Sequence, residues 1–357
     1  MKRLSVDIIG TYPPPIGGTS IHLQRLLRAN REHGIDAIAY DTRANEQGKD
    51  VNNEYVKPII NYKKFLLGYY LNKRADIIHS HSHSWVERMI LTIKAKMCGQ
   101  KTVFTFHSFR DELSTFNTKQ KFAYRYVIKN ADAFIATSPD IKEKLVEWGC
   151  KPDKISIIPP FIAPSKEDGG MRLGNEIESF KERFDFIISA NASNNDHFNG
   201  EDLYGLDMCI ELICSLSLDY NVGFIYVLTK TTDRPYLDSM KKKIQECGIS
   251  DKFLLIEGSL DFISLLKISA IFVRPTNTDS WGLSVGESLS LGVPCVASDV
   301  CKREEGTIFF KVRDQDNFDL KVRECIEGIE KEKEKLQAIE ISDYYDEVLD
   351  VYNKLIS

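Results

Sequence analysis

The sequence predicts an α/β protein of two domains, each built on a parallel β-sheet covered by helices. Short apolar runs typical of buried strands alternate with helical patterns from the first residues onward, as in βαβ units. The 357 residues suit two domains of ordinary size better than one. A polar, glycine-containing stretch over 163–182 separates the two series of elements. We therefore expect a first domain over 1–163 and a second over 164–339.

The elements of the first domain follow a repeated strand-and-helix order. Strands are expected at 4–9, 35–40, 76–79, 102–106, 133–137 and 155–158, with helices starting near Thr19 and after Ser138. The turn over 10–18 lacks the spacing G-x-G-x-x-G, so a standard dinucleotide fingerprint is absent. Gly17 and Gly18 end this turn, and a glycine pair lets a ligand approach the backbone closely.

The second domain repeats the pattern. Strands are expected at 185–190, 222–228, 253–256, 270–273 and 295–297, and helices at 203–216 and 236–247. Residues 317–334 are strongly charged and predict a solvated helix. Residues 344–356 carry apolar side chains at positions i, i+3 and i+4, which predicts an amphipathic final helix.

The most informative stretch runs over 271–299, with the sequence IFVRPTNTDSWGLSVGESLSLGVPCVASD. A strand ends at Pro275, a polar loop follows, and a helix is expected after Trp281-Gly282-Leu283 with Ser284 as its N-cap. Such a strand, loop and helix start binds anions and sugar hydroxyls in open α/β sheets, because unpaired backbone N–H groups point out of the helix start.

Two carboxylates frame this loop and helix. Asp279 lies in the loop, and Glu287 follows eight positions later on the helix. Together with the Trp-Gly-Leu between them and the Leu-Gly-Val-Pro after them, they resemble the E-x7-E signature of family 4 glycosyltransferases, with Asp279 in place of the first Glu. That family consists of retaining enzymes with the GT-B fold. The resemblance implies two facing Rossmann-like domains with a cleft between them and a C-terminal helix, 340–357, that crosses back to the first domain.

The resemblance also implies roles for individual residues. In the family the first acid, here Asp279, lies by the transferred sugar, and the second, here Glu287, holds the ribose hydroxyls of the nucleotide. The residues matching the helix start, which would present backbone N–H groups to the donor, are Trp281, Gly282, Leu283 and Ser284.

Two features of the first domain match the family as well. His107 directly follows the expected strand in VFTFHSF, which resembles the family's strand-histidine step, whose histidine reaches the donor sugar. Gly17 and Gly18 match a Gly-Gly loop that faces the donor diphosphate. Polar residues at such strand ends are where open α/β sheets bind ligands.

The sequence departs from the family at its phosphate-binding cations. Members carry an Arg and a Lys in the loop after the first strand of the second domain, and the Lys directly precedes Gly-Leu. Here that loop starts at Asn191, Tyr204 precedes Gly205-Leu206, and no Lys or Arg occurs over 185–228. We expect Asn191 to line the donor site, and Lys230 or Arg274, each at a strand end, or backbone N–H groups to meet the phosphate charge.

Three histidines at alternate positions, His79, His81 and His83, would share one face of an extended chain. Imidazole nitrogens are good zinc ligands, so a metal site is one interpretation. The family needs no metal, and we favour the interpretation that these residues form the polar end of a strand that lines the cleft. We expect no metal in the site.

Composition bears on compartment and partners. No run approaches the ~18 apolar residues of a membrane span, and the N-terminus lacks a signal-peptide pattern. The eight cysteines are scattered without C-x-x-C, as for free thiols in a reducing cytoplasm. Residues 1–165 carry 25 Lys and Arg against 16 Asp and Glu, and residues 166–357 carry 22 against 36. We expect a cytoplasmic protein, and no nucleic-acid partner because no recognised motif accompanies the positive charge.

These observations predict a metal-independent, retaining glycosyltransferase that uses no cofactor. Its donor would be a nucleotide-diphosphate sugar, UDP- or GDP-linked, and its acceptor a glycan or polyprenyl-diphosphate-linked molecule of cell-surface polysaccharide biosynthesis. His107 and Asp279 are the candidate catalytic residues. Two alternatives stay open: a nucleotide-sugar epimerase of the same fold, and a non-catalytic partner subunit, which the missing cations make conceivable.

Residues 61–74, NYKKFLLGYYLNKR, mix basic and large apolar side chains. An amphipathic core helix explains this composition, and so does peripheral docking onto an anionic membrane surface at the inner face of the plasma membrane. Each Lys or Arg that reaches an anionic surface contributes about 1 kcal/mol.

We predict that changing Lys63, Lys64 and Lys73 together to Glu releases the protein from anionic vesicles in a flotation assay at low salt. The matched control changes Lys331, Lys333 and Lys335, which lie in the acidic second half, and should leave flotation unchanged. A wild-type protein that fails to float with anionic vesicles at low salt would contradict membrane docking.

Overall fold

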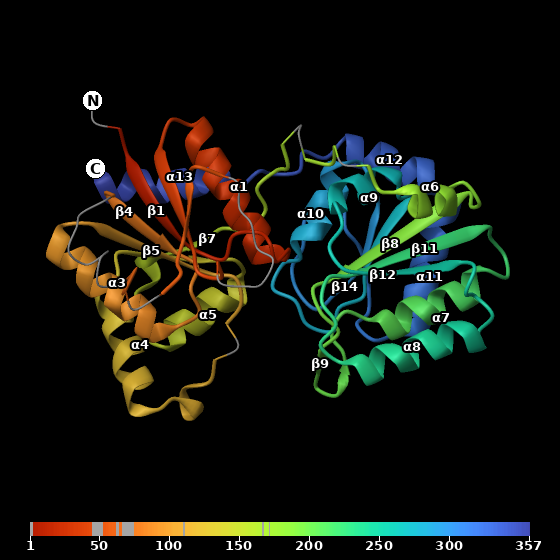
Figure 1. The fold of residues 1–357 in the computed structure, drawn as a ribbon, viewed down its shortest axis with the longest axis horizontal. Helices are drawn as coiled ribbons and strands as arrows, with labels where there is room; N and C mark the ends of the chain where they lie inside the picture. The colour runs from red at the N-terminus through yellow and green to blue at the C-terminus, as the bar shows by residue number, and fades with distance from the viewer. Residues whose placement is uncertain are drawn as a thin grey trace. The chain divides into compact units, whose positions relative to one another are not determined.

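The protein divides into two compact units, Met1–Ile162 with Asp343–Ser357 and Ala163–Ser342. The computed structural model describes residues 3–44, 53–61, 64–65, 75–109, 111–165, 168–170 and 172–357 (Figure 1). Each unit is built on one parallel sheet with helices interleaved between its strands, which confirms the predicted α/β fold class. We describe each unit by itself.

The sheet of the first unit has the strand order β3-β2-β1-β4-β5-β6-β7 within the described residues. Its strands are β1 (Ser5–Gly10), β2 (Asp36–Asp41), β3 (Val56–Pro58), β4 (Ile77–Ser80), β5 (Lys101–Phe106), β6 (Ala133–Ala136) and β7 (Ile155–Ile157). The helices are α1 (Gly18–Glu32), α3 (Trp85–Cys98), α4 (Thr118–Asn130), α5 (Pro139–Glu147) and α13 (Tyr345–Ile356), with 3-10 turns at Leu113–Thr115 and Pro152–Lys154.

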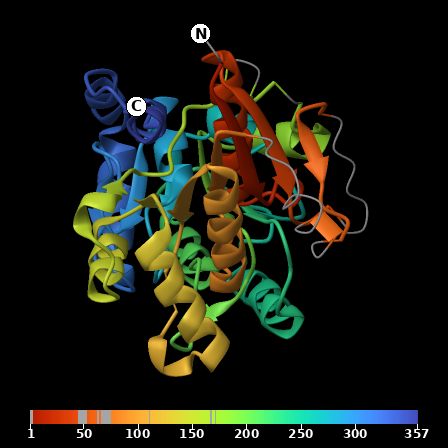
Figure 2. The same ribbon diagram turned by 90° about the vertical axis from the view of Figure 1, so that its left-hand side faces the viewer.

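Alternate side chains of these strands enter two separate cores. Val6 and Ile8 of β1 pack with α1 and α13 on one face. Phe104 and Phe106 of β5 pack with α3 and α4 on the other face, where these two helices lie side by side (Figures 1 and 2). A parallel sheet covered on both faces needs strands that are apolar throughout, which is why the strands of this unit were readable as short apolar runs.

The C-terminal helix α13 belongs to the first unit, as the resemblance implied. Its apolar stripe, which includes Tyr345, Val348 and Tyr352, is buried against the core that contains β1. The Tyr352 hydroxyl lies 2.6 Å from Nδ1 of His79, and Nε2 of His79 lies 2.7 Å from the Thr105 hydroxyl. His79 is therefore a buried side chain with both ring nitrogens hydrogen-bonded, and it joins α13 to strands β4 and β5.

The sheet of the second unit has the strand order β12-β11-β8-β13-β14-β15. Its strands are β8 (Phe186–Ala192), β11 (Val222–Leu228), β12 (Phe253–Glu257), β13 (Ile271–Arg274), β14 (Cys295–Ser298) and β15 (Ile308–Phe310), and β9 (His197–Phe198) pairs with β10 (Glu201–Asp202) in a separate hairpin. The helices are α6 (Asn175–Lys181), α7 (Leu206–Leu216), α8 (Arg234–Glu246), α9 (Phe262–Ile268), α10 (Leu283–Ser290), α11 (Gln315–Glu327) and α12 (Ile329–Gln337).

This sheet is also buried on both faces. Helices α7, α8 and α11 cover one face, and Ile188 of β8 and Phe224 of β11 point into that core. Helices α6, α9, α10 and α12 supply apolar side chains to the clusters on the opposite face, which contain Ile187, Ile225 and Phe272. The strand ends that carry the candidate site residues are thus held between two packed layers.

Three sequence-based expectations need correction. The segment 163–182 is not only a linker, because α6 within it buries Ile177 and Phe180. The charged segment 317–334 forms the two helices α11 and α12 rather than one solvated helix, and α11 buries Phe318 and Val322. Ser284 is not the N-cap of α10, which begins at Leu283 with Gly282 at the cap. The two helical segments contain few apolar residues, so their sequences show little helical periodicity. The start of α10 lies at a glycine turn, which gives no periodic signal either.

No helix among the described residues is long and apolar enough to cross a membrane. The segment 61–74, predicted to dock on an anionic surface, lies outside the described residues except for Asn61, Lys64 and Phe65. Phe65 is partly buried against the core that contains Tyr40, and Lys64 is exposed.

The contact between His79 and Tyr352 yields a stability prediction. Tyr352→Phe removes the hydroxyl and leaves a ring nitrogen of buried His79 without its partner, which costs about 1–3 kcal/mol. The matched control is Tyr220→Phe, whose hydroxyl bonds the exposed Glu327 and should matter far less. Thermal unfolding of both variants measures the difference, and equal midpoints would show that this bond does not hold α13.

Candidate active site

The candidate site of the second unit lies where the strand order of its sheet reverses. Counted along the chain, the strands follow the order 3-2-1-4-5-6, and the reversal falls between β8 and β13. In doubly wound sheets, ligands bind at the carboxyl ends of the strands at this switch point. Asn191 lies at the end of β8, and Arg274 is the last residue of β13.

Arg274 connects three other residues singled out from the sequence. Its Nη1 donates to Oδ1 of Asn191 at 3.2 Å and to the Ser284 hydroxyl at 3.4 Å. Its Nε donates to Oδ2 of Asp279 at 3.1 Å. The guanidinium therefore lies between the end of β8, the loop that carries Asp279 and the first turn of α10.

A second guanidinium, that of Arg303, shares the same carboxylate. Its Nη1 donates to Oδ2 of Asp279 at 3.2 Å and to the Trp281 carbonyl at 3.1 Å. Its other nitrogens donate to the Thr276 hydroxyl and to the Ser298 carbonyl. The Arg303 side chain is fully buried, and sequence reasoning missed it because Lys302-Arg303-Glu304-Glu305 has the composition of an exposed turn.

Asp279 is held as an anion by these neighbours. Burial acts to raise the pKa of its carboxyl, but the charges and hydrogen bonds of Arg274 and Arg303 outweigh burial and lower the pKa to about 2. Oδ1 accepts the backbone N–H of Ser280 at 3.0 Å. A carboxylate ionised throughout the physiological range, with both oxygens engaged, can orient cations but is poorly suited to donate a proton.

Gly282 is required by the geometry of this group. Its backbone has φ of 81°, a left-handed conformation that favours glycine. A Cβ at this position would lie 2.6 Å from Nη1 of Arg303 and 3.0 Å from Oδ2 of Asp279. The Trp-Gly-Leu sequence therefore lets the chain turn tightly around the shared carboxylate before α10 begins at Leu283, which is half-buried.

Of the remaining predicted residues of this unit, Glu287 and Trp281 are buried, whereas Lys230 is exposed. Glu287 lies on α10 and is 6% exposed, and Trp281 is buried with its Nε1 donating to Glu304 at 2.9 Å. Lys230 is exposed beyond the end of β11, and within the described residues no hydrogen bond joins it to the Arg274 group. The structure thus brings Arg274, rather than Lys230, into contact with the other site residues.

Tyr204, which stands where the family has its phosphate-binding Lys, lies beneath Arg274. The guanidinium carbon is 5.3 Å from the centre of the Tyr204 ring, within range of a cation–π interaction. The start of the neighbouring helix α7 is already capped, because Asp202 accepts backbone N–H groups of Tyr204, Gly205 and Leu206. Arg274 therefore supplies a cation beside the position that the family gives to Lys.

In the first unit, Gly17 and Gly18 start α1. Gly17 caps the helix in an extended conformation, and its N–H donates to the Ser20 hydroxyl. A Cβ added at either glycine would meet nothing within 4 Å among the described residues. The fold of this unit alone therefore does not demand glycine at these two positions.

His107 directly follows β5 and is half-buried. Its Nε2 is 2.9 Å from Nδ1 of His81, which follows β4, and its ring lies 4.9 Å from that of His22 on α1. The ring nitrogens that converge are thus those of His22, His81 and His107, not those of the sequential set His79, His81 and His83. The His79 ring stacks on that of His81 with centroids 4.5 Å apart, but its two nitrogens lie against the Tyr352 and Thr105 hydroxyls.

Comparison with protein families identifies the chain. The family described as Glycosyltransferase Family 4 matches residues 16–166, and the family described as Glycosyl transferases group 1 matches residues 205–336. The chain belongs to the family 4-type glycosyltransferases. The two matches together cover most of the chain and confirm the resemblance recognised in the sequence.

Known relatives of this glycosyltransferase are distant. A galactosyltransferase of Escherichia coli, named UDP-Gal:α-D-GlcNAc-diphosphoundecaprenol α-1,3-galactosyltransferase, is 25% identical over 69% of this chain and 65% of its own length. An uncharacterized glycosyltransferase of Methanocaldococcus jannaschii is 22% identical over 84% of this chain and 79% of its own.

Solved glycosyltransferases share the whole fold. A glycosyltransferase from Rickettsia africae superposes with a TM-score of 0.75 at 15% identity and covers all of both chains. The Anabaena protein HepE in complex with UDP superposes with a TM-score of 0.72 at 14% identity, over 99% of this chain and 98% of that one. This glycosyltransferase therefore has the GT-B fold.

The shared carboxylate yields a prediction for stability. Asp279→Asn leaves the fully buried Arg303 without its counter-charge, and breaking a buried pair in this way costs about 3–5 kcal/mol. The matched control Asp219→Asn removes an exposed partner of Arg323, for which about 0–1 kcal/mol is expected. Urea unfolding of the glycosyltransferase at neutral pH compares the two.

The same variant has a pH signature. The folded-state pKa of Asp279 lies below the ordinary 3.8, so its stabilising contribution is present above pH 3.8 and is lost as the pH falls towards about 2. The stability gap between wild type and Asp279→Asn should therefore narrow over this window. A gap that stays constant on acidification would contradict the proposed ion pair.

Proposed function

We propose that this glycosyltransferase moves a sugar from a UDP-sugar, with retention of anomeric configuration and without a metal ion, to a glycan or polyprenyl-diphosphate-linked acceptor in cell-surface polysaccharide assembly. The observation that carries the proposal is the Arg274 group at the switch point, where a guanidinium, an amide and a helix start converge. Retention is what the family resemblance implies, and the leaving phosphate would serve as the base.

The leaving diphosphate needs positive charge as the glycosidic bond breaks. Arg274 and Arg303 share the carboxylate of Asp279, so these three side chains together carry a net charge of +1. The backbone N–H groups at the start of α10 add to it, because they lack partners within the helix. We assign to Asp279 the orientation of the two guanidinium groups beside the transferred sugar, and to Arg274 contact with the diphosphate.

The proposed donor rests on relatives and on Glu287. The E. coli relative is named for UDP-galactose, and the Anabaena structure contains UDP. A nearly buried carboxylate on α10 suits the two hydroxyls of a ribose, since charged hydrogen bonds are stronger than neutral ones. The acceptor named for the E. coli relative is a diphosphoundecaprenol-linked sugar, which supports a lipid-linked acceptor here.

The first unit would contribute His107 and the pair Gly17-Gly18. We assign to His107 a hydrogen bond to the donor sugar, since it directly follows β5, near the switch point of the first sheet. Gly17 and Gly18 would let the donor diphosphate approach the backbone at the start of α1, and no side chain fills the space beside them among the described residues.

The direct test incubates the protein with a panel of UDP- and GDP-sugars, with and without lipid-linked acceptors and in the presence of a chelator. Transfer with release of UDP supports the proposal, and the product's anomeric configuration tests retention. A new sugar epimer with no free nucleotide would indicate an epimerase. No turnover of any sugar nucleotide would indicate a non-catalytic subunit.

Two substitutions separate recognition of ribose from recognition of phosphate. Glu287→Gln should weaken binding of UDP and of uridine alike by about 10-fold, because a charged hydrogen bond is worth about 1.5–3 kcal/mol. Arg274→Gln should weaken UDP binding while leaving uridine unchanged, since uridine carries no phosphate. Calorimetric titration measures both.

The matched control for these substitutions is Glu211→Gln, an exposed carboxylate on α7 that pairs with Lys243. It should leave both affinities at the wild-type value. Unchanged UDP affinity in Glu287→Gln would exclude this residue from the nucleotide site, and an equal loss of UDP and uridine in Arg274→Gln would indicate a general effect on folding.

A further inference from the structure

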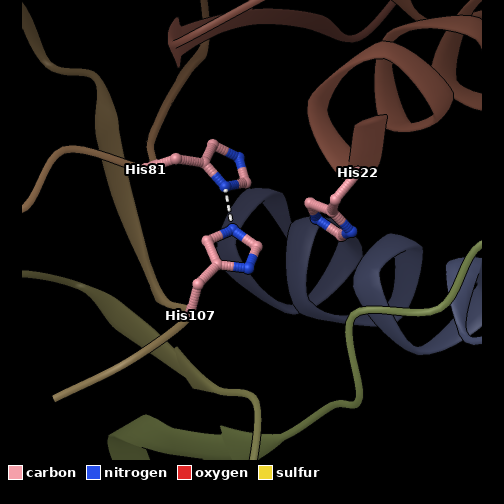
Figure 3. Close-up of side chains that lie close together, drawn as sticks. All are labelled: His22, His81 and His107. Atoms are coloured by element: carbon pink, nitrogen blue, oxygen red, sulfur yellow. Dashed lines mark hydrogen bonds between the residues drawn. The ribbon is translucent and has the colours of Figure 1, made fainter. Parts of the chain in front are cut away.

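Three histidines converge at the switch point of the first sheet, outside the donor site described for the second unit. The strand order of this sheet reverses between β1 and β4. His22 comes from α1, His81 from the turn after β4, and His107 from the turn after β5 (Figure 3). One ring nitrogen from each lies within 4.8 Å of those of the other two. Among the described residues, no carboxylate or thiol joins them.

The spacing of the rings matches that of imidazoles around one metal ion. The ring centroids are 5.4 Å apart for His22 and His81, 4.9 Å for His22 and His107, and 5.2 Å for His81 and His107. Zinc holds imidazole nitrogens at about 2.0–2.1 Å, which in tetrahedral geometry sets the ring centroids roughly 5 Å apart. The backbone thus already holds the three side chains at the separation a tetrahedral ion requires.

The hydrogen bond made by His22 leaves its second ring nitrogen with a lone pair that can bind a metal ion. Nδ1 of His22 lies 2.7 Å from the Pro160 carbonyl, which can only accept, so Nδ1 carries the proton and Nε2 keeps its lone pair. A ligating histidine is commonly oriented in this way through its second nitrogen.

Among the described residues, one ring nitrogen of the cluster has no hydrogen-bond partner, and one hydrogen bond joins two of its rings. Nε2 of His81 is buried without a hydrogen-bond partner among the described residues. The bond between Nδ1 of His81 and Nε2 of His107 is 2.9 Å long, whereas two nitrogens on a tetrahedral ion lie about 3.3 Å apart. Metal binding would therefore replace this bond with a small outward movement, and the shared proton would move to the second nitrogen of its ring.

We propose that His22, His81 and His107 form a site for a zinc-class transition-metal ion, and that the bound ion blocks sugar transfer by capturing His107. Three imidazoles leave the fourth tetrahedral position to water or an anion. The blocking effect rests on the role assigned to His107 under the proposed function, whereas the metal site itself does not.

Binding is tested on the full chain without any sugar donor. Protein freed of metal by a chelator is titrated with ZnCl2 by calorimetry and with CoCl2 by visible absorption, where tetrahedral cobalt gives intense bands. We expect one equivalent to bind. Because loss of an outer-shell partner alone costs about 10–100-fold in metal affinity, His22→Ala should weaken binding by at least about 10-fold.

Two further variants test whether the metal binds at these three histidines. His197→Ala removes an exposed histidine of the second unit and should leave affinity and stoichiometry unchanged. His107→Ala, at a half-buried position, provides a second ligand variant in case the buried His22→Ala fails to fold, which circular dichroism would reveal. No binding by the wild type, or equal binding by the wild type and both ligand variants, would overturn the site.

The blocking effect needs a separate measurement. One equivalent of zinc should abolish sugar transfer by the wild type, a chelator should restore it, and His22→Ala should need about 10-fold more zinc for the same loss. Zinc that binds with the predicted signature while transfer continues would overturn the blocking effect and the role of His107, but not the site. Transfer that fails without zinc would count against the proposed function alone.

Discussion

The second unit depends on one carboxylate shared by two buried guanidinium groups. Asp279 pairs with Arg274, which faces Asn191 and the start of α10, and with Arg303, which holds the loop through Trp281 and Ser298. Burying either cation alone would carry a desolvation penalty of several kcal/mol, and the shared anion offsets it for both. The left-handed turn at Gly282 lets the chain pass close to this group. The placement of the helix start, and hence of its free N–H groups, follows from that contact.

In the first unit, the side chains at the strand ends are held by hydrogen bonds between rings, hydroxyls and a carbonyl rather than by ion pairs. Its strand ends carry imidazoles whose pKa values burial lowers, and hydrogen bonds to Tyr352, Thr105, Pro160 and one another orient the rings. A neutral ring avoids the desolvation penalty of an ion but keeps one lone pair and one N–H. The two switch points therefore differ in chemistry: an ion-pair network in one unit, and a set of uncharged donors and ligands in the other.

Two departures from the family pattern, Tyr204 in place of Lys and Asp279 in place of Glu, both lie in contact with Arg274. The family's phosphate-binding Lys is Tyr204 here, and Arg274 lies over that ring with its guanidinium directed to Asn191 and Ser284. Arg274 needs a counter-charge at this depth, and the shorter Asp279 provides it. The sequence analysis expected Lys230, Arg274 or backbone N–H groups to meet the phosphate charge, and the contacts place Arg274 beside Tyr204, Asn191 and Asp279.

The sequence alone determined the fold class and the positions of most strands along the chain, because apolar periodicity is a local signal. The spacing of Asp279, Gly282 and Glu287 is local as well, and it identified the family and, through the family, the return of the last helix to the first domain. It also brought Asn191 and Arg274 into consideration through their places at strand ends. Only the tertiary structure decided that Arg303 shares the Asp279 carboxylate with Arg274 and that the ring nitrogens of His22, His81 and His107 converge. Such contacts join residues more than 20 positions apart, and they follow from strand order, which brings distant chain segments to the same edge of a sheet.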